Sequence, residues 1–537
     1  MLENMSANTR LILAVSLSII FFVAYTAIFP PAKLSEEQNN TTAVQSLATT
    51  NQNTEGASVA QAGHNILSDE RVVNKEATIL SSIDSEHFSL KIDTLGRISS
   101  KILKDEKYYI DDKPIELIAQ TGAQPLYIRF ADDQLNEAAL KTAYSSNVDK
   151  ITLTESNSAQ VILTQRLPDL TVTKTVTFYS NGQYDVAVQL SKPTRYFLYV
   201  GQHAEHKNQM MMALQGVMAY DRAEVANIFE DGDVEGRTTY RDVVLLSAFD
   251  QYFASIFYDF GSDTIVNIDR DRDDNPAAYL ELDNSIEFKG YVGPKDYELL
   301  KSIEPELVNA IEFGWFTFAA KPLFIVLLWL HNLLGNWGWS IVVLVILLRI
   351  VLFPLTQKGM LSMAKLKDLA PKMKELREKH KGDPQRMNAA TMELYRKHGA
   401  NPFGGCLPML LQIPVFFAVY RVLLNAVELQ GAPWIFWIDD LSRMDPYFIL
   451  PILMGASMYY QQKITPNNFT DPLQEKIFSY LPIIFTFFFI TFPAGLVLYW
   501  FVNNLLSIAQ QFVVNKQHGA AKLKVAEATQ ELSKKDK

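Results

Sequence analysis

The chain has 537 residues, enough for two or three domains, and its 48% hydrophobic content and mean hydropathy of +0.01 are ordinary for a soluble protein. That average conceals two parts: residues 33–314 carry 25 Lys and Arg against 44 Asp and Glu, whereas residues 315–537 carry 23 against 14, which indicates an acidic soluble part joined to a basic membrane part. The single cysteine, Cys406, excludes an internal disulfide framework and a cysteine-rich metal site, and no basic region carries a nucleic-acid-binding motif.

The first predicted element is a membrane anchor at 11–29. These nineteen uncharged residues would form a helix of about 28 Å, long enough to cross a bilayer core. A cleaved signal peptide is the alternative, but the bulky Phe29-Pro30-Pro31 stands where small residues are wanted. Arg10 on the short side places the N-terminus in the cytoplasm, so residues 1–32 are expected to form a cytoplasmic tip and anchor. Residues 33–63, rich in Ser, Thr, Asn and Gln, predict a disordered linker in the periplasm of a Gram-negative cell.

Residues 64–314 predict a large β-sandwich. Short runs alternate apolar and polar residues with many β-branched side chains, as half-buried strands do. The clearest runs are 87–92, 125–130, 160–165 and 171–178. Asn181-Gly182, between two such runs, predicts a hairpin turn.

Two features of this domain raise the question of a metal site. Asp269, Asp271 and Asp273 are spaced like calcium ligands, but Gly at the sixth and Glu at the twelfth loop position are missing, so a solvated turn is favoured. His203 and His206 lack a third ligand at metal spacing and are interpreted as surface residues. No enzyme is indicated here.

Beyond the sandwich, the predicted membrane core comprises residues 336–515. Apolar segments lie at 316–334, 339–355, 406–424, 447–460, 477–492 and 494–514. If all six crossed, the loop 357–405, with 11 Lys and Arg against 5 Asp and Glu, would lie outside, against the positive-inside rule. The segment near 315–335 contains Lys321, Pro322 and His331, so we expect an amphipathic helix at the outer interface and five clustered spans.

The loop 357–405 predicts a cytoplasmic helical hairpin. Leu366, Leu369, Met373 and Leu376 form an apolar stripe at helical spacing. Gly382 is suited to end one helix, and Asp383-Pro384 to cap and begin the next. The basic hairpin and the basic tail 516–537 suit contact with anionic lipid, a ribosome or a nascent chain, although a solvated positive-inside face explains the charges equally well.

Arg349 is the most informative residue of the core because it lies well inside the second apolar segment. An arginine at that depth costs at least about 2.5–3.5 kcal/mol on insertion scales. The five clustered spans contain no Asp or Glu to neutralise it. A hydrated cavity that attracts anions is one interpretation, and snorkelling to the cytoplasmic interface is the other.

Other polar side chains could line the same cavity. Gln412 and Tyr499 are candidates, and Asn503, Ser507 and Gln510 follow i, i+4, i+7 spacing on the last span. Ordinary hydrogen bonding between helices explains any single Asn or Gln better. Spans of 14 and 16 residues at 447–460 and 477–492 are short enough to thin the bilayer. Phenylalanines on the segments 406–424 and 477–492 suit lipid contact or packing as well as a client-binding surface.

At these residues the chain resembles the YidC/Oxa/Alb family of membrane protein insertases, in its Gram-negative form. The resemblance covers nearly the whole chain, including the extra anchor and the periplasmic sandwich. Its strongest stretches are 348–355, 401–408, 445–455 and 492–500, with the hairpin between the first two. The resemblance implies a multi-domain membrane protein: an α-helical core of five clustered spans plus an N-terminal anchor, with a large periplasmic β-sandwich domain.

The resemblance also implies the site. A hydrophilic groove, open to the cytoplasm and lipid, would hold the polar segment of a client, and a hydrophobic slide would hold its apolar segment. The matching groove positions are Arg349, Gln412, Tyr499, Trp500 and Asn503. The matching slide positions are Ile413, Phe416, Ile484 and Phe488. Val345 and Trp500 depart from the family pattern, so this groove is expected to be less polar than that of relatives.

The expected function is a non-enzymatic insertase and folding chaperone of the bacterial inner membrane, with both termini in the cytoplasm. It would insert and assemble nascent membrane proteins alone or with the Sec translocon and its accessory subunits, without a cofactor or metal. Two alternatives remain. One is a solute transporter or flippase that uses Arg349 as an anion site, although no internal repeat is evident. The other is an intramembrane hydrolase, for which no span contains a Ser–His pair.

Overall fold

The computed structural model describes residues 78–535, except 111–112, 156, 205–212, 272, 381–382, 399–406 and 466–471. The predicted anchor at 11–29 and linker at 33–63 therefore lie outside the described residues, as do His206 and Cys406. The described chain divides into two compact units. One runs to Gly314 and includes Asn425–Glu428, and the other comprises Trp315–Leu424 and the chain from Leu429 onward.

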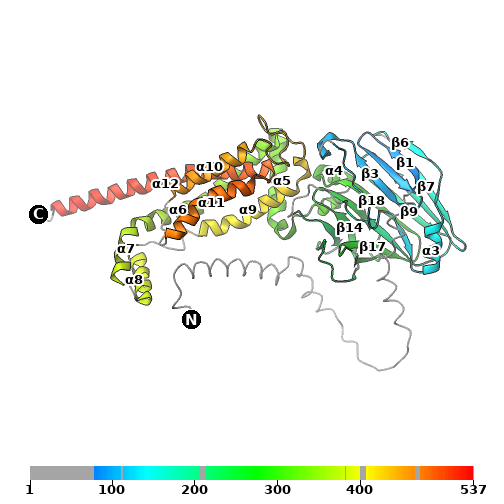
Figure 1. The fold of residues 1–537 in the computed structure, drawn as a ribbon, viewed down its shortest axis with the longest axis horizontal. Coiled ribbons are helices and arrows are strands. Elements are labelled where there is room, and N and C mark those ends of the chain that lie inside the picture. The colour runs from blue at the N-terminus through cyan, green and yellow to red at the C-terminus, as the bar shows by residue number, and fades with distance from the viewer. Residues whose placement is uncertain are drawn as a thin grey trace, which may run out of the picture. The chain divides into compact units, whose positions relative to one another are not determined.

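The first unit consists of three β-sheets, which confirms the predicted β-sandwich (Figure 1). The nine-stranded sheet has the order β12 (Ala226–Glu230), β11 (Gly216–Asp221), β14 (Val243–Phe249), β15 (Phe253–Tyr258), β18 (Ile286–Pro294), β9 (Gln183–Leu190), β8 (Thr171–Phe178), β7 (Ala159–Arg166), β5 (Ser145–Ser146). The four-stranded sheet has the order β3 (Ile98–Leu103), β2 (Phe88–Asp93), β1 (Ile79–Asp84), β6 (Lys150–Thr152). The five-stranded sheet has the order β13 (Thr238–Tyr240), β16 (Ile265–Arg270), β17 (Pro276–Leu282), β10 (Tyr196–Gly201), β4 (Ile128–Phe130).

Alternation along the strands builds the core of this unit. In β8, Val172 and Val176 are fully buried while the threonines between them are half-buried, so one face packs inward. The predicted turn joins β8 to β9, and Gly182 has φ +91°, a conformation that suits glycine. The predicted run at 125–130 is a strand only from Ile128. Two short α-helices, α3 (Asp133–Lys141) and α4 (Tyr297–Ile303), and the 3₁₀ helices Glu106–Tyr108 and Pro305–Ala310 belong to the unit, and a further 3₁₀ helix, Val427–Leu429, begins in it.

Two interpretations of polar residues in this unit can be compared with the structure. The prediction of surface histidines is wrong for His203, whose side chain is only 12% exposed and whose Nε2 lies 2.8 Å from Asp231. The predicted solvated turn holds only for the residues between β16 and β17, and it is wrong for Asp269, which is a buried residue of β16. Asp269 forms an ion pair with Arg237 at 3.0 Å, and Asp271 accepts the backbone N–H groups of Asp273 and Asn275. These carboxylates are thus occupied by the protein itself.

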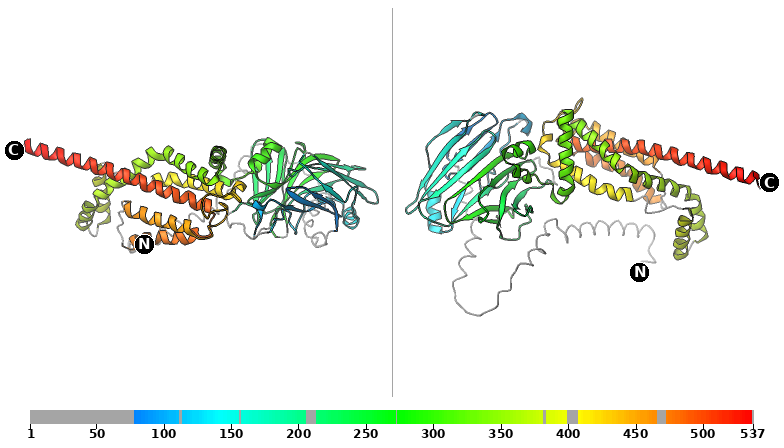
Figure 2. Two further views of the ribbon diagram at one scale, coloured as in Figure 1. Left: turned by 90° about the horizontal axis from the view of Figure 1, so that it is seen from above. Right: turned by 180° about the vertical axis from the view of Figure 1, so that it is seen from behind.

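The second unit is helical (Figures 1 and 2). Its helices are α5 (Thr317–Leu334), α6 (Trp337–Asp368), α7 (Ala370–Lys379), α8 (Pro384–Lys397), α9 (Leu407–Asn425), α10 (Ile449–Ile464), α11 (Pro472–Phe489) and α12 (Ala494–Lys535). Both α6 and α12 extend well past the predicted spans, because polar residues continue the helix once the apolar segment ends. Figure 2 shows α12 projecting beyond the other helices of the unit.

Three described helices are long and apolar enough to cross a membrane by length and composition: Thr317–Leu334, Trp337–Leu366 and Ala494–Gly519. Shorter apolar stretches occupy Gln412–Asn425 and Lys476–Phe489. The helix α5, predicted to lie at the interface, thus meets the criteria for a span. Its outward side chains include the exposed Phe318, Trp329 and Leu333, so that side of the helix is apolar.

The hairpin between α6 and α9 has the predicted cap. Asp383 accepts a hydrogen bond from the Arg386 N–H at 3.1 Å, and Pro384 is the first residue of α8. The predicted apolar stripe does not lie on one helix, because α6 ends at Asp368 and α7 begins at Ala370. Leu366 and Leu369 are nevertheless buried, and Tyr395 of α8 packs against them. The apolar cluster thus joins the end of α6 and the residue at the break to α8.

Candidate functional site

Arg349 lies on α6 twelve residues after its start, or about 18 Å along the helix axis. Its guanidinium is bound by α12. Nε donates to Oδ1 of Asn503 at 2.9 Å, and Nη2 donates to the backbone carbonyl of Asn503 at 3.1 Å and to the hydroxyl of Ser507. Because Asn503 and Ser507 are one helical turn apart, both lie on the side of α12 that contacts Arg349, as their spacing predicted.

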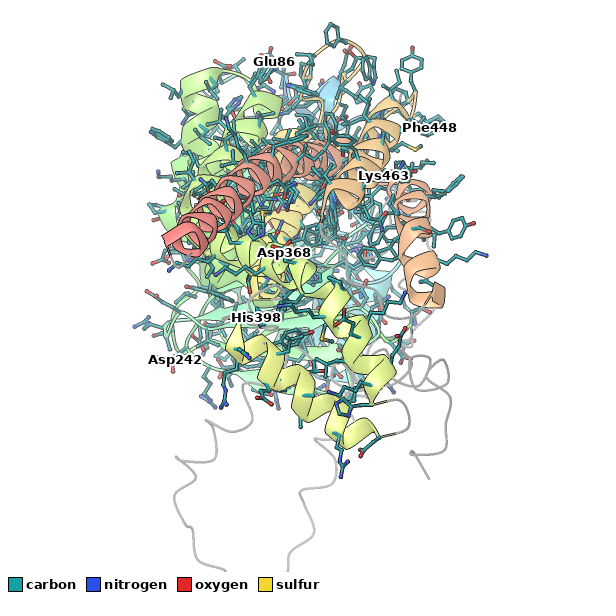
Figure 3. All side chains as sticks on the ribbon, turned by 90° about the vertical axis from the view of Figure 1, so that its left-hand side faces the viewer. Glu86, Asp242, Asp368, His398, Phe448 and Lys463 are labelled. Atoms are coloured by element: carbon teal, nitrogen blue, oxygen red, sulfur yellow. The ribbon has the colours of Figure 1, made fainter. Side chains whose placement is uncertain are left out.

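The contacts of Arg349 begin a ladder of polar pairs between α6 and α12. About two turns further along, Thr356 accepts a hydrogen bond from Gln510 at 2.9 Å, and Gln357 donates to Gln517 at 2.8 Å. At the end of α6, Asp368 lies 2.8 Å from Nε2 of His518, and Figure 3 shows Asp368 beside α12. We name these pairs the polar seam. Each of these side chains has a protein partner: the Thr356–Gln510 pair is buried, whereas the Gln357–Gln517 and Asp368–His518 pairs are exposed.

A second polar contact leaves α12 in another direction. The amide of Asn504, which is buried, donates to the hydroxyl of Ser457 on α10 at 3.1 Å. Neighbouring asparagines thus serve different helices: Asn503 contacts α6 and Asn504 contacts α10. Hydrogen bonds of this kind hold membrane helices together at a modest free-energy gain, on average about 0.6 kcal/mol each.

The positive charge of Arg349 is the unusual feature of the seam. The hydrogen-bond partners described above are neutral, so they orient the guanidinium without cancelling its charge. Tyr499, which is buried on α12, is close enough to Arg349 for an electrostatic interaction. An arginine in surroundings of low dielectric constant attracts an anion more strongly than one in water. The seam therefore offers a fixed cation to an incoming acidic group.

The structure places the other predicted groove residues differently. Gln412 lies on α9 and is half-buried. Trp500 packs against aromatic rings: its ring centroid is 4.8 Å from that of Phe416 and 4.9 Å from that of Phe489. Phe416 belongs to α9 and Phe489 to α11, so Trp500 packs α12 against both of these helices. Its contacts are those of an apolar cluster.

The predicted slide residues lie on the surfaces of α9 and α11. Ile413, Ile484 and Phe488 are 45%, 59% and 56% exposed, whereas Phe416 is half-buried against Trp500. Phe487, which was not assigned to the slide, is the most exposed of the neighbouring phenylalanines at 71%. Large apolar side chains with this exposure require lipid or another apolar chain as a neighbour. These exposed residues form what we call the apolar face.

Sequence reasoning missed part of the seam. Thr356 and Gln357 were not singled out, although they follow Arg349 by seven and eight residues and so lie on the same side of α6. That spacing was the available indication. Within the described residues, no group of three His, Cys, Asp or Glu side chains suited to a metal lies in the helical unit.

Comparison with known proteins identifies the family. The family described as 60Kd inner membrane protein matches residues 329–521, and the YidC periplasmic domain matches residues 280–326. The membrane protein insertase YidC of Campylobacter jejuni is 48% identical over 519 residues, which cover 96% of this chain and 97% of that protein. The corresponding protein of Wolinella succinogenes is 45% identical, with 97% of each chain covered.

Solved structures give a weaker likeness. A crystal structure of an active YidC insertase with its first transmembrane domain resolved is 18% identical, with a TM-score of 0.38 over 81% of this chain and 94% of that one. The family assignment rests on the relatives that are similar over their full length. On that basis, this chain belongs to the YidC family of membrane protein insertases.

Proposed function

We propose that this protein inserts nascent membrane proteins into the bacterial inner membrane and assists their folding, with the polar seam and the apolar face as its two client-binding surfaces. The observation that carries the proposal is Arg349, a cation held by neutral partners on α12. Its charge gives an acidic or polar client segment a binding position part of the way across the membrane. Arg349, Gln412, Tyr499 and Asn503 form the proposed groove, and Trp500 forms its boundary with the apolar face.

The apolar part of the client takes a separate path. Its helix contacts the apolar face formed by Ile413, Ile484 and Phe488 while its polar segment rests near Arg349. Transfer of apolar surface from water to lipid releases about 25 cal/mol per Å², so a client helix that buries about 1,000 Å² supplies about 25 kcal/mol. That exceeds the cost of carrying a short polar segment past the seam, so no cofactor or nucleotide is needed.

The proposed arrangement in the membrane follows the charge distribution. Both termini and the hairpin α7–α8 lie in the cytoplasm, the β-sandwich lies in the periplasm, α5 lies at the outer interface, and the five clustered spans with the anchor cross the bilayer. The basic hairpin and tail face the side where nascent chains emerge, which suits contact with the ribosome. Action both alone and beside the Sec translocon completes the proposal.

The test follows a small membrane protein with a short acidic outer tail in cells depleted of this protein. Re-expression of the wild type should restore protease protection of the client. Arg349→Lys should restore more protection than Arg349→Ala, because lysine keeps the charge. Arg443→Ala, which removes an exposed arginine paired with Asp440 in an outer loop, serves as the control and should behave as wild type.

Equal protection with Arg349→Lys and Arg349→Ala would refute the role of the charge. If depletion left insertion unaffected but abolished uptake of a solute or export of a lipid, the transporter alternative would replace the insertase. A cysteine probe at Lys321 tests the topology. It should react from outside, and reaction only from inside would overturn the proposed arrangement.

A further inference from the structure

The β-rich unit carries a cluster of metal-binding side chains that the insertase function does not use. It consists of Glu86, His87 and Glu155, whose potential ligand atoms all lie within 4.8 Å of one another. The three residues also line a cavity of about 480 Å³, together with Leu153, Thr154 and Ser180. The cluster lies at one end of the four-stranded sheet, of which Figure 1 labels β3, β1 and β6.

The sheet topology brings these residues together. β1 and β6 are paired in parallel, with Asp84 opposite Thr152 as the last pair. The pairing continues for one further hydrogen bond, from the Leu153 N–H to the Asp84 carbonyl at 2.7 Å. Glu86-His87 and Glu155 therefore follow the two strands by two or three residues and lie at the same end of the sheet. The backbone pairing of β1 with β6 thus brings together residues from two segments that are distant in the sequence.

The surroundings of His87 favour a metal. Nδ1 lies 3.3 Å from Oδ1 of Asp105, and a metal bound at Nε2 would keep this contact. A carboxylate behind a histidine is a common feature of metal sites, because it fixes the tautomer and orients the ring. Lys104, the nearby cation, is engaged by Asp84 at 2.7 Å, so it does not neutralise the two glutamates.

We infer that Glu86, His87 and Glu155 bind a divalent transition metal of the zinc type, with water completing the coordination. One imidazole and two carboxylates suit such an ion better than calcium or magnesium, which prefer oxygen ligands alone. Ligand bonds of about 2.0–2.2 Å require the three atoms to close in by roughly 1 Å, which exposed glutamates do by changing rotamer. The bound ion would connect the β1–β2 turn to the loop that follows β6.

The test uses the full chain, purified in detergent, treated with a chelator and titrated with Co²⁺ as a spectroscopic probe, followed by displacement with Zn²⁺. One equivalent of Co²⁺ should bind with visible absorption bands and raise the midpoint of thermal unfolding. His87→Ala and Glu155→Gln should each weaken binding at least tenfold. Both side chains are exposed, so neither variant should impair folding.

His398→Ala is the matched control, because His398 is an exposed histidine at the C-cap of α8 that hydrogen-bonds to the Leu394 carbonyl. It should bind Co²⁺ as the wild type does. Absence of saturable binding in the wild type would overturn the inference. Equal affinities of His87→Ala and His398→Ala would overturn it as well, and a loss confined to His87→Ala would exclude the three-ligand site.

Discussion

Replacement of Asn503 by alanine should weaken the hold of α12 on Arg349 and leave the helices otherwise intact. The change removes the Oδ1 acceptor at 2.9 Å and keeps the backbone carbonyl at 3.1 Å and the hydroxyl of Ser507. A hydrogen bond to a charged group contributes about 1.5–3 kcal/mol in soluble proteins, but measured couplings between membrane helices average about 0.6 kcal/mol. We therefore expect a coupling of about 1 kcal/mol between Asn503 and Arg349.

The assay is a double-mutant cycle with Arg349→Ala, Asn503→Ala and the double variant, measured by thermal unfolding in detergent. The double variant should be hardly less stable than Arg349→Ala, because alanine at 349 has already removed the partner of Asn503. Client insertion, measured with the same variants, should fall with Asn503→Ala. The double variant should insert no less client than Arg349→Ala alone. Both results follow from one contact.

Asn504→Ala is the control for this cycle, because the neighbouring asparagine contacts Ser457 on α10. It should lower stability to a similar degree but show no coupling to Arg349. If Asn503→Ala and Arg349→Ala are additive within about 0.3 kcal/mol, the contact carries no free energy and the reasoning from the polar seam is refuted.

Three further predictions concern packing and buried charge. Burial raises the pKa of Glu428 to about 7. Between about pH 4.5 and 7 the unfolded chain loses a proton that the folded chain keeps, so the free energy of unfolding should fall as the pH rises. Glu428→Gln should flatten this part of a plot of unfolding midpoint against pH. Burial lowers the pKa of Lys174 to about 7, so between about pH 7 and 10.5 the unfolded chain binds a proton that the folded chain does not, and stability should rise with pH. Lys174→Met should reduce this rise. The same variant should destabilise the fold by about 1–3 kcal/mol, because two backbone carbonyls lose their hydrogen-bond donor. A Cβ on Gly455 would overlap Thr486, so Gly455→Ala should lower the unfolding midpoint, and Thr486→Ala should restore part of the loss.

Each of these predictions has a contrary outcome. An unchanged pH profile in Glu428→Gln would show that this carboxyl titrates normally in the folded protein. A profile of Lys174→Met parallel to that of the wild type would place the titrating group elsewhere. Full stability of Gly455→Ala would mean that α10 and α11 separate without cost.

The sequence was sufficient for elements whose cause is local. Period-two alternation predicted β8 with its bounds, and Asn181-Gly182 predicted the hairpin that follows. Asp383-Pro384 predicted the start of α8, because a capping side chain and a fixed proline φ act on their own backbone. Helix spacing likewise placed Asn503 and Ser507 on one side of α12. The family resemblance was also readable, and the full-length relatives confirmed it.

Contacts between distant segments required the tertiary structure. The spacing of residues along a helix shows which of them share a side, but not which neighbouring helix packs against that side. The partners of Arg349 and the aromatic surroundings of Trp500 therefore became known only from the packing of α6, α9, α11 and α12. The parallel pairing of β1 with β6 likewise brought His87 to Glu155 across 68 positions of sequence. The physical reason is the same in each case: local propensity acts within a few residues, whereas partners across the fold are selected by the burial of surface that all elements share.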